Sequence, residues 1–233
     1  MYIQDVHERK VIPTMPNWVM NELSCIFHDA ESYNAFKNKA DVKKFYHSFF
    51  PMPEVLEGTS SPHIAPGDFI NALNKRKRTN FLTLEEVASC DDEWDAHRAK
   101  EIAQNIKAFE QTGYHDWYSW NMNNWGVKWD ACNCLIGNDL PDFNTIIYAF
   151  DSPWGTPEHF VIELSKLYPN ATFEMVSGSI ENDSHHEFTC EDGKYIETCC
   201  YETFKEAVID GKWGGAKEWE MLFEDEQVCH SKK

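Results

Sequence analysis

The order of predicted strands and helices is the feature that most narrows the fold of this chain. Apolar residues predict a strand at 19–27, and a helix that Asp29 or Ser32 could cap follows it and runs to about Phe50. The second half predicts, in order, strands at 127–131 and 144–150, a helix at 156–168 with Thr156 as its cap, strands at 171–177, 187–189 and 194–201, and a short helix at 204–209. Because such strands need helices to cover them, the order favours an α+β fold with an antiparallel sheet.

A helical insertion interrupts this order near residues 51–111. Residues 51–80 contain four of the ten prolines and read mainly as a loop with a short helix, and helices are predicted at 81–88 and 92–111, with Thr83 and Gly113 as start and stop signals. We therefore expect an N-terminal arm at 1–14, one α+β domain at 15–200 that carries the insertion, and an acidic C-terminal extension at 201–233.

Composition narrows the class of protein. The 233 residues are 42% hydrophobic and carry a net charge of −18 from 21 basic and 39 acidic residues, which is unfavourable for direct nucleic-acid binding. No run of 18 apolar residues predicts a membrane span, and the first residues do not resemble a signal peptide. We expect a cytoplasmic protein whose eight cysteines are thiols rather than disulfides.

Three widely spaced motifs resemble the YubB-like family of phage and plasmid proteins. They are residues 15–21 (MPNWVMN), residues 125–131 (WGVKWDA), and residues 150–154 (FDSPW) followed by a helix that ends at 164–169 (LSKLYP). The resemblance implies a ferredoxin-like domain and a mobile-element origin, and it implies no settled activity. Family members often carry Cys where this chain has Val19, so no metal or redox role is expected there.

The cysteines and histidines offer one metal hypothesis. Cys132 and Cys134 would share one face of a strand and could hold zinc together with His185 or His186. The favoured interpretation is that the cysteines are small buried residues and that the two histidines lie in a polar hairpin loop. The sequence contains no recognised nucleophile, phosphate-loop or metalloprotease motif, so we expect no catalytic residue, metal or cofactor.

Aromatic residues are dense between Tyr114 and Trp129. Core packing with satisfied indole N–H groups is the favoured interpretation. The alternative is an enzyme or binding protein with a small-molecule or nucleotide pocket lined by Asn17, Trp18, Asn124, Trp125, Lys128 and Trp129.

Acidic residues are concentrated near the C-terminal end. Residues 181–226 contain fourteen Asp and Glu and four Lys, and 14 minus 4 gives a net charge of −10. This run is either a solvated face or a surface that replaces phosphates on a cationic, nucleic-acid-binding protein. The expected partner-binding residues are Glu218, Glu220, Glu224, Asp225 and Glu226, with Trp213, Trp219 and Phe223 as aromatic anchors.

The favoured function is therefore a phage or plasmid accessory protein that binds and inhibits a host defence protein, of the anti-CRISPR or anti-restriction type. A structural or regulatory protein of the mobile element, without a defence target, is a further alternative.

Overall fold

The structure is a computed structural model that describes residues 17–198 and 201–213, and it divides into two compact units. The first unit contains the described residues up to Phe49 and those from Trp129 onward, and the second unit is Phe50–Lys128. The second unit thus continues beyond the insertion expected near 51–111, because helix α6 (Trp117–Asn124) and the turn after it belong to it.

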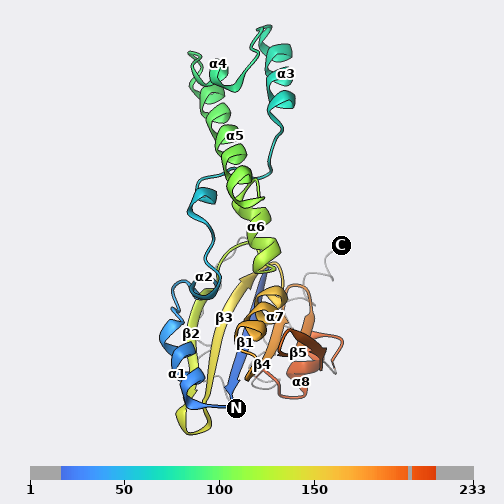
Figure 1. The fold of residues 1–233 in the computed structure, drawn as a ribbon. Coiled ribbons are helices and arrows are strands. Elements are labelled where there is room, and N and C mark those ends of the chain that lie inside the picture. Colours follow the sequence, from blue (N-terminus) through green and yellow to red (C-terminus); the bar gives the residue numbers. More distant parts are fainter. Residues whose placement is uncertain (1–16, 199–200, 214–233) are drawn as a thin grey trace, which may run out of the picture. The chain divides into compact units, whose positions relative to one another are not determined.

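The first unit is built on a six-stranded antiparallel sheet with the order β2-β3-β1-β4-β5-β6 (Figure 1). Its strands are β1 (Trp18–Phe27), β2 (Cys132–Leu140), β3 (Thr145–Pro153), β4 (Ala171–Ser179), β5 (Ser184–Glu191) and β6 (Lys194–Glu197). The helices are α1 (Ala30–Lys39), α2 (Phe45–Phe49), α7 (Glu158–Leu167) and α8 (Phe204–Ile209), and the short helix η3 (Pro141–Phe143) joins β2 to β3. The first four strands with α1 and α7 have the split βαβ order of a ferredoxin-like domain, which confirms the α+β class.

An aromatic core lies between one face of the sheet and the helices α1, α2 and α7. Phe36 of α1 stacks on Phe49 of α2 with ring centroids 4.7 Å apart, and it contacts Phe27 of β1 at 5.1 Å. Phe45 of α2 lies 4.7 Å from Tyr148 of β3. Alternate residues of β1 are buried, so the period-two pattern of this strand fixes the face that the helices cover.

The helix expected from Asp29 to Phe50 is two helices. Asp29 caps α1 as expected, through a hydrogen bond from the Ser32 N–H to Oδ1 of 2.7 Å, but α1 ends at Lys39. Near the start of α2, the N–H groups of Tyr46 and His47 donate to the carboxylate of Asp130, at 2.7 and 3.2 Å. The strand expected at 127–131 is therefore wrong as well, because Asp130 serves the helix and β2 begins only at Cys132.

Two local expectations about α7 and β5 are also wrong. Helix α7 begins at Glu158 after Pro157, which supplies no side-chain cap, so Thr156 is not the capping residue. Residues His185 and His186 lie within strand β5 rather than in a hairpin loop, because their pairing with β4 extends to the end of that strand.

The second unit is helical. It contains the short helix η2 (Glu54–Leu56) and the helices α3 (Pro66–Lys77), α4 (Leu84–Ala88), α5 (Glu93–Thr112) and α6 (Figure 1). Thr83 caps α4, and Gly113 ends α5 with a φ of 77°, so both signals were correct. The apolar faces of α3, α4 and α5 meet at Leu73, Val87 and Ile102, so the insertion has a core of its own.

Candidate functional site

The face of the sheet opposite α1, α2 and α7 carries a group of carboxylates. We call it the α8 face and define it by Glu22, Glu174, Val176, Glu187 and Glu191. The register places Val176 of β4 between Glu22 of β1 and Glu187 of β5. Because residues two apart on a strand share a face, Glu174 and Glu191 belong to the same side.

Glu174 is the centre of this group. It pairs with Ser24 of β1 and with Thr189 of β5, so each of Glu22, Glu187 and Glu191 is its diagonal neighbour. Diagonal neighbours on a sheet lie about 7–8 Å apart. Glu174 and Glu191 are exposed, whereas Glu22 is half-buried, and this burial raises its pKa.

Helix α8 covers one end of the α8 face. Phe204, Ala207 and Val208 of α8 form a buried cluster with Trp213, and Met20 and Val176 of the sheet pack against it. Gly178 of β4 makes this contact possible. A Cβ atom at this position would lie 2.6 Å from Cδ2 of Phe204 and 2.7 Å from Cζ2 of Trp213.

A hydrogen-bonded chain fastens the end of this segment to the sheet. The Trp213 indole N–H donates to Nδ1 of His185 over 3.1 Å, and Nε2 of His185 lies 2.8 Å from Oε1 of Glu187. Lys212 Nζ lies 3.1 Å from the same oxygen. Burial lowers the pKa of His185, against the opposing effect of Glu187. Burial raises the pKa of Glu187, but the hydrogen bonds from His185 and Lys212 outweigh it and leave this pKa below its ordinary value.

Trp213 was expected to be an exposed anchor, and this is wrong. Its exposed fraction is 8%, because α8 and the sheet enclose its ring. The other expected partner-binding residues lie outside the described residues; they are Glu218, Trp219, Glu220, Phe223, Glu224, Asp225 and Glu226.

The six residues of the hypothetical aromatic pocket fall into two groups. Asn124, Trp125 and Lys128 belong to the second unit, and Asn17, Trp18 and Trp129 belong to the first. Trp125 is only 3% exposed, and its indole N–H donates to the carbonyl of Phe50 over 3.0 Å. The Asn124 amide donates to the carbonyl of Trp120, and the Lys128 carbonyl accepts from the Asn121 amide. These contacts give this half of the set a packing role.

The other half of the set lies at one end of the sheet. The rings of Trp18 and Trp129 meet edge to face with centroids 6.2 Å apart. The amide of Asn17 donates to the Asn182 side chain over 3.0 Å. Trp18 pairs with Pro153 at the end of β3, and the Asn17 carbonyl accepts from the Trp154 N–H over 2.8 Å, so both residues lie beside the loop between β3 and α7.

A metal site is not apparent in the described part of the chain. No group of three or more His, Cys, Asp or Glu side chains there is placed to hold an ion. Asn133 has a φ of 51°, and the register shifts between Cys132 and Leu135, so the regular alternation assumed for Cys132 and Cys134 is broken. Burial raises the pKa of Cys134 to about 12, which disfavours the thiolate that binds metals.

The basic cluster at residues 75–78 is paired within its own unit. Arg76 lies 2.8 Å from Asp95, and Lys77 contacts both Asp92 and Asp95. Asp95 is buried and 1% exposed. Two of the four cations are therefore partly neutralised by carboxylates of α5 and its cap.

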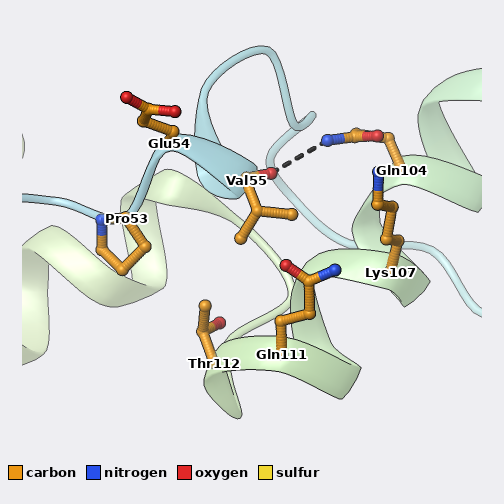
Figure 2. A pocket seen from close by; sticks show the side chains of 7 residues that line it. All are labelled: Pro53, Glu54, Val55, Gln104, Lys107, Gln111 and Thr112. Carbon is orange, nitrogen blue, oxygen red and sulfur yellow. Dashed lines mark hydrogen bonds between the residues drawn. The ribbon is translucent and has the colours of Figure 1, made fainter.

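The second unit also has a surface hollow of about 740 Å³ (Figure 2). Gln104, Lys107 and Gln111 of α5 line it together with Val55 of η2, and the Gln104 amide donates to the Val55 carbonyl over 2.9 Å. Its titratable groups are Glu54 and Lys107, so the hollow lacks the convergent acid, base and nucleophile that catalysis needs.

None of the helices that the structure describes combines the length and the apolar character needed to cross a membrane.

Comparisons with known proteins give a distant structural likeness. No family model and no curated protein match the chain. The crystal structure of a protein api92 from Yersinia pseudotuberculosis, described with the family model DUF1281, superposes with a TM-score of 0.44 and 10% sequence identity. The match covers 81% of this chain and 99% of the other.

Proposed function

We propose that this protein is a non-enzymatic inhibitor that binds the cationic surface of a nucleic-acid-binding protein through the α8 face. The observation that carries the proposal is the position of Glu174, which has three carboxylates as diagonal neighbours on adjacent strands. Lys and Arg side chains that bind phosphates also bind carboxylates, through charge-assisted hydrogen bonds. An array of this kind therefore competes for the same cations.

The charge distribution supports this proposal. Residues 129–198, which form most of the sheet, contain thirteen Asp and Glu and two Lys, and 13 minus 2 gives a net charge of −11. One of the two lysines, Lys166, already pairs with Glu163. A negative charge of this size attracts a cationic partner and raises the rate of association.

The candidate acid–base groups support binding rather than catalysis. Each ring nitrogen of His185 has a hydrogen-bond partner, Trp213 or Glu187. The thiols of Cys134 and Cys190 have pKa values raised to about 12 by burial, so they are poor nucleophiles.

The resemblance to YubB-like phage and plasmid proteins supports a finer version of the proposal. The partner would be a host defence protein, such as a CRISPR or restriction complex, and the inhibitor would act in the host cytoplasm. In this version, Glu218, Glu220, Glu224, Asp225 and Glu226 would also bind the partner.

The proposal is tested with a charge reversal and a matched control. The double variant Glu174→Lys/Glu191→Lys changes two exposed carboxylates of the α8 face, and Glu57→Lys/Glu110→Lys makes the same charge change at exposed positions of the second unit. Each immobilised variant is offered the heparin-binding protein fraction of a bacterial lysate, with and without excess duplex DNA.

We expect the wild type and the control to retain the same proteins and duplex DNA to displace them, because phosphates and carboxylates would compete for one cationic surface. The α8-face variant should retain at least tenfold less, on the scale of electrostatic steering. Equal retention by the two double variants would refute the proposal.

A further inference from the structure

Trp154, in the loop between β3 and α7, combines exposure with a strained backbone. Its side chain is 61% exposed, and its φ of 73° lies in the left-handed region, which bulky residues rarely adopt. The next residue is Gly155, which would accept such a φ without strain, yet Gly155 does not adopt it. The fold therefore holds a Trp at the one position of this loop where a Trp is conformationally disfavoured.

Buried hydrogen bonds hold the loop in this conformation. Ser152 donates to the Gly155 carbonyl over 2.7 Å and accepts from the Asn21 amide over 2.8 Å. Ser177 donates to the other end of the Asn21 amide over 2.8 Å, and all three side chains are buried. The Trp154 N–H donates to the Asn17 carbonyl over 2.8 Å. Strain that is held in this way by the surrounding structure is characteristic of functional positions.

The surroundings of Trp154 are acidic. Asn17, which accepts from the Trp154 N–H, also donates to Asn182 in the β4–β5 turn, so this turn meets the loop through Asn17. Glu181 and Asp183 flank Asn182, and both are exposed; one oxygen of Asp183 accepts from the Lys205 N–H. The exposed indole of Trp154 and the exposed carboxylates of Glu181 and Asp183 thus lie at the same end of the sheet. Together they match a guanidinium or ammonium group, which stacks on an aromatic ring and pairs with acids.

We infer that Trp154 is an aromatic anchor for an Arg or Lys side chain of a protein partner, with Glu181 and Asp183 completing the contact. Trp125 shows the contrast in exposure, since it is only 3% exposed. Exposed Trp residues that are rigidly presented are typical interface hot spots. The inference rests on the cationic partner of the proposed function and adds the residue that would hold it.

The test uses hexa-arginine as the probe, with hexa-citrulline as an uncharged peptide of similar shape. Trp154→Asn removes the ring but keeps a residue that tolerates a positive φ. The matched control is Phe143→Asn. Phe143 is 73% exposed and lies just before the start of β3, at the opposite end of this strand from Trp154. Peptide affinity is measured by titration of ¹⁵N-labelled protein, in which the peak missing from the Trp154→Asn spectrum identifies the Trp154 indole N–H.

We expect hexa-arginine to shift the Trp154 indole signal, and Trp154→Asn to weaken binding about fivefold or more, on the scale of a cation–π contact. Phe143→Asn and the aromatic replacement Trp154→Tyr should bind within about twofold of the wild type, and hexa-citrulline should not bind. Unfolding by urea should show Trp154→Asn to be at least as stable as the wild type.

Two outcomes would overturn the inference: equal affinity of Trp154→Asn and the wild type, or an indole signal that does not move. If Trp154→Asn binds normally while Glu174→Lys/Glu191→Lys does not, the anchor is refuted and the α8-face proposal stands. If both bind normally, both proposals fail.

Discussion

The indole N–H of Trp213 donates to Nδ1 of His185, which requires this nitrogen to be unprotonated. The proton of the neutral imidazole then lies on Nε2, which faces Glu187. The packing of α8 against the sheet is therefore coupled to one protonation state of one histidine.

The free energy of unfolding should fall as the pH drops below about 6.5. Burial holds the pKa of His185 below its ordinary value of 6.5, so the unfolded chain takes up a proton before the folded chain does. The stabilisation is complete above that value and is lost as the pH falls through it. Urea unfolding at pH 8.0, 6.5 and 5.5 measures this effect.

His185→Gln should reduce the pH dependence of the free energy of unfolding. The control His159→Gln, at an exposed position, should not. Identical pH profiles for the three proteins would contradict the coupling.

Gly178→Ala should destabilise the first unit by about 1–3 kcal/mol, the usual cost of overpacking. The added Cβ would lie 2.6 Å from the ring of Phe204, so α8 or the strand must move. Gly137→Ala on β2 is the control, because its Cβ would meet nothing closer than 3.6 Å. Urea unfolding followed by tryptophan fluorescence checks both variants. Equal stabilities would mean that α8 does not pack as described.

Trp125→Ala should destabilise the second unit by about 3–5 kcal/mol, because it leaves a large cavity in a core. Trp125→Phe keeps most of the apolar area but loses the hydrogen bond to the Phe50 carbonyl. It should therefore lower the free energy of unfolding by only about 1 kcal/mol. Thermal unfolding followed by circular dichroism separates the two. A Trp125→Ala protein that unfolds like the wild type would restore the pocket hypothesis for this residue.

The element order was predictable because it depends on short-range patterns. The period of two in β1 and the apolar face of α5 are visible within ten to twenty residues, and the caps Asp29, Thr83 and Gly113 act on their own helices. The break between α1 and α2 was not predictable in this way. It depends on Asp130, which lies 84 residues from Tyr46 in the chain and is brought to it by the tertiary fold.

The candidate site was predictable only in its chemistry. The aromatic stretch at 114–129 and the acidic stretch at 181–226 were apparent in the sequence, but the group around Glu174 needs the register of three strands. Exposure could not be read from residue type either: Trp213 was expected at the surface and is buried, whereas Trp154 is exposed. The one available signal was the FDSPW motif before a glycine, which marks a turn.

The five described cysteines are thiols, and we expect no disulfide among the eight in the chain. Mass spectrometry of unreduced, alkylated protein should find eight alkylated sites after denaturation. In the folded protein, Cys134 and Cys190 should react more slowly than Cys90, because burial raises their pKa values to about 12. A stoichiometric disulfide, or equal rates at these three positions, would contradict the expectation.

The wild-type protein should not bind nucleic acid, and the reason lies partly in the ion pairs of Asp95. Net charge of −18 repels phosphate, and Arg76 and Lys77 are occupied by Asp92 and Asp95. A gel shift with duplex or single-stranded DNA at moderate salt should stay negative to about ten micromolar or above.

Neutralising the two paired carboxylates should leave Arg76 and Lys77 available to bind phosphate. Asp92→Asn/Asp95→Asn keeps the side-chain volumes but leaves residues 75–78 without their acidic partners, so a weak, salt-sensitive DNA shift should appear. Asp91→Asn/Glu93→Gln makes the same change in net charge at exposed neighbouring positions and should not produce it. A shift with both variants would mean that net charge alone determines whether the protein binds DNA. A shift with the wild type, abolished by neutralising residues 75–78, would mean that these cations act despite their ion pairs.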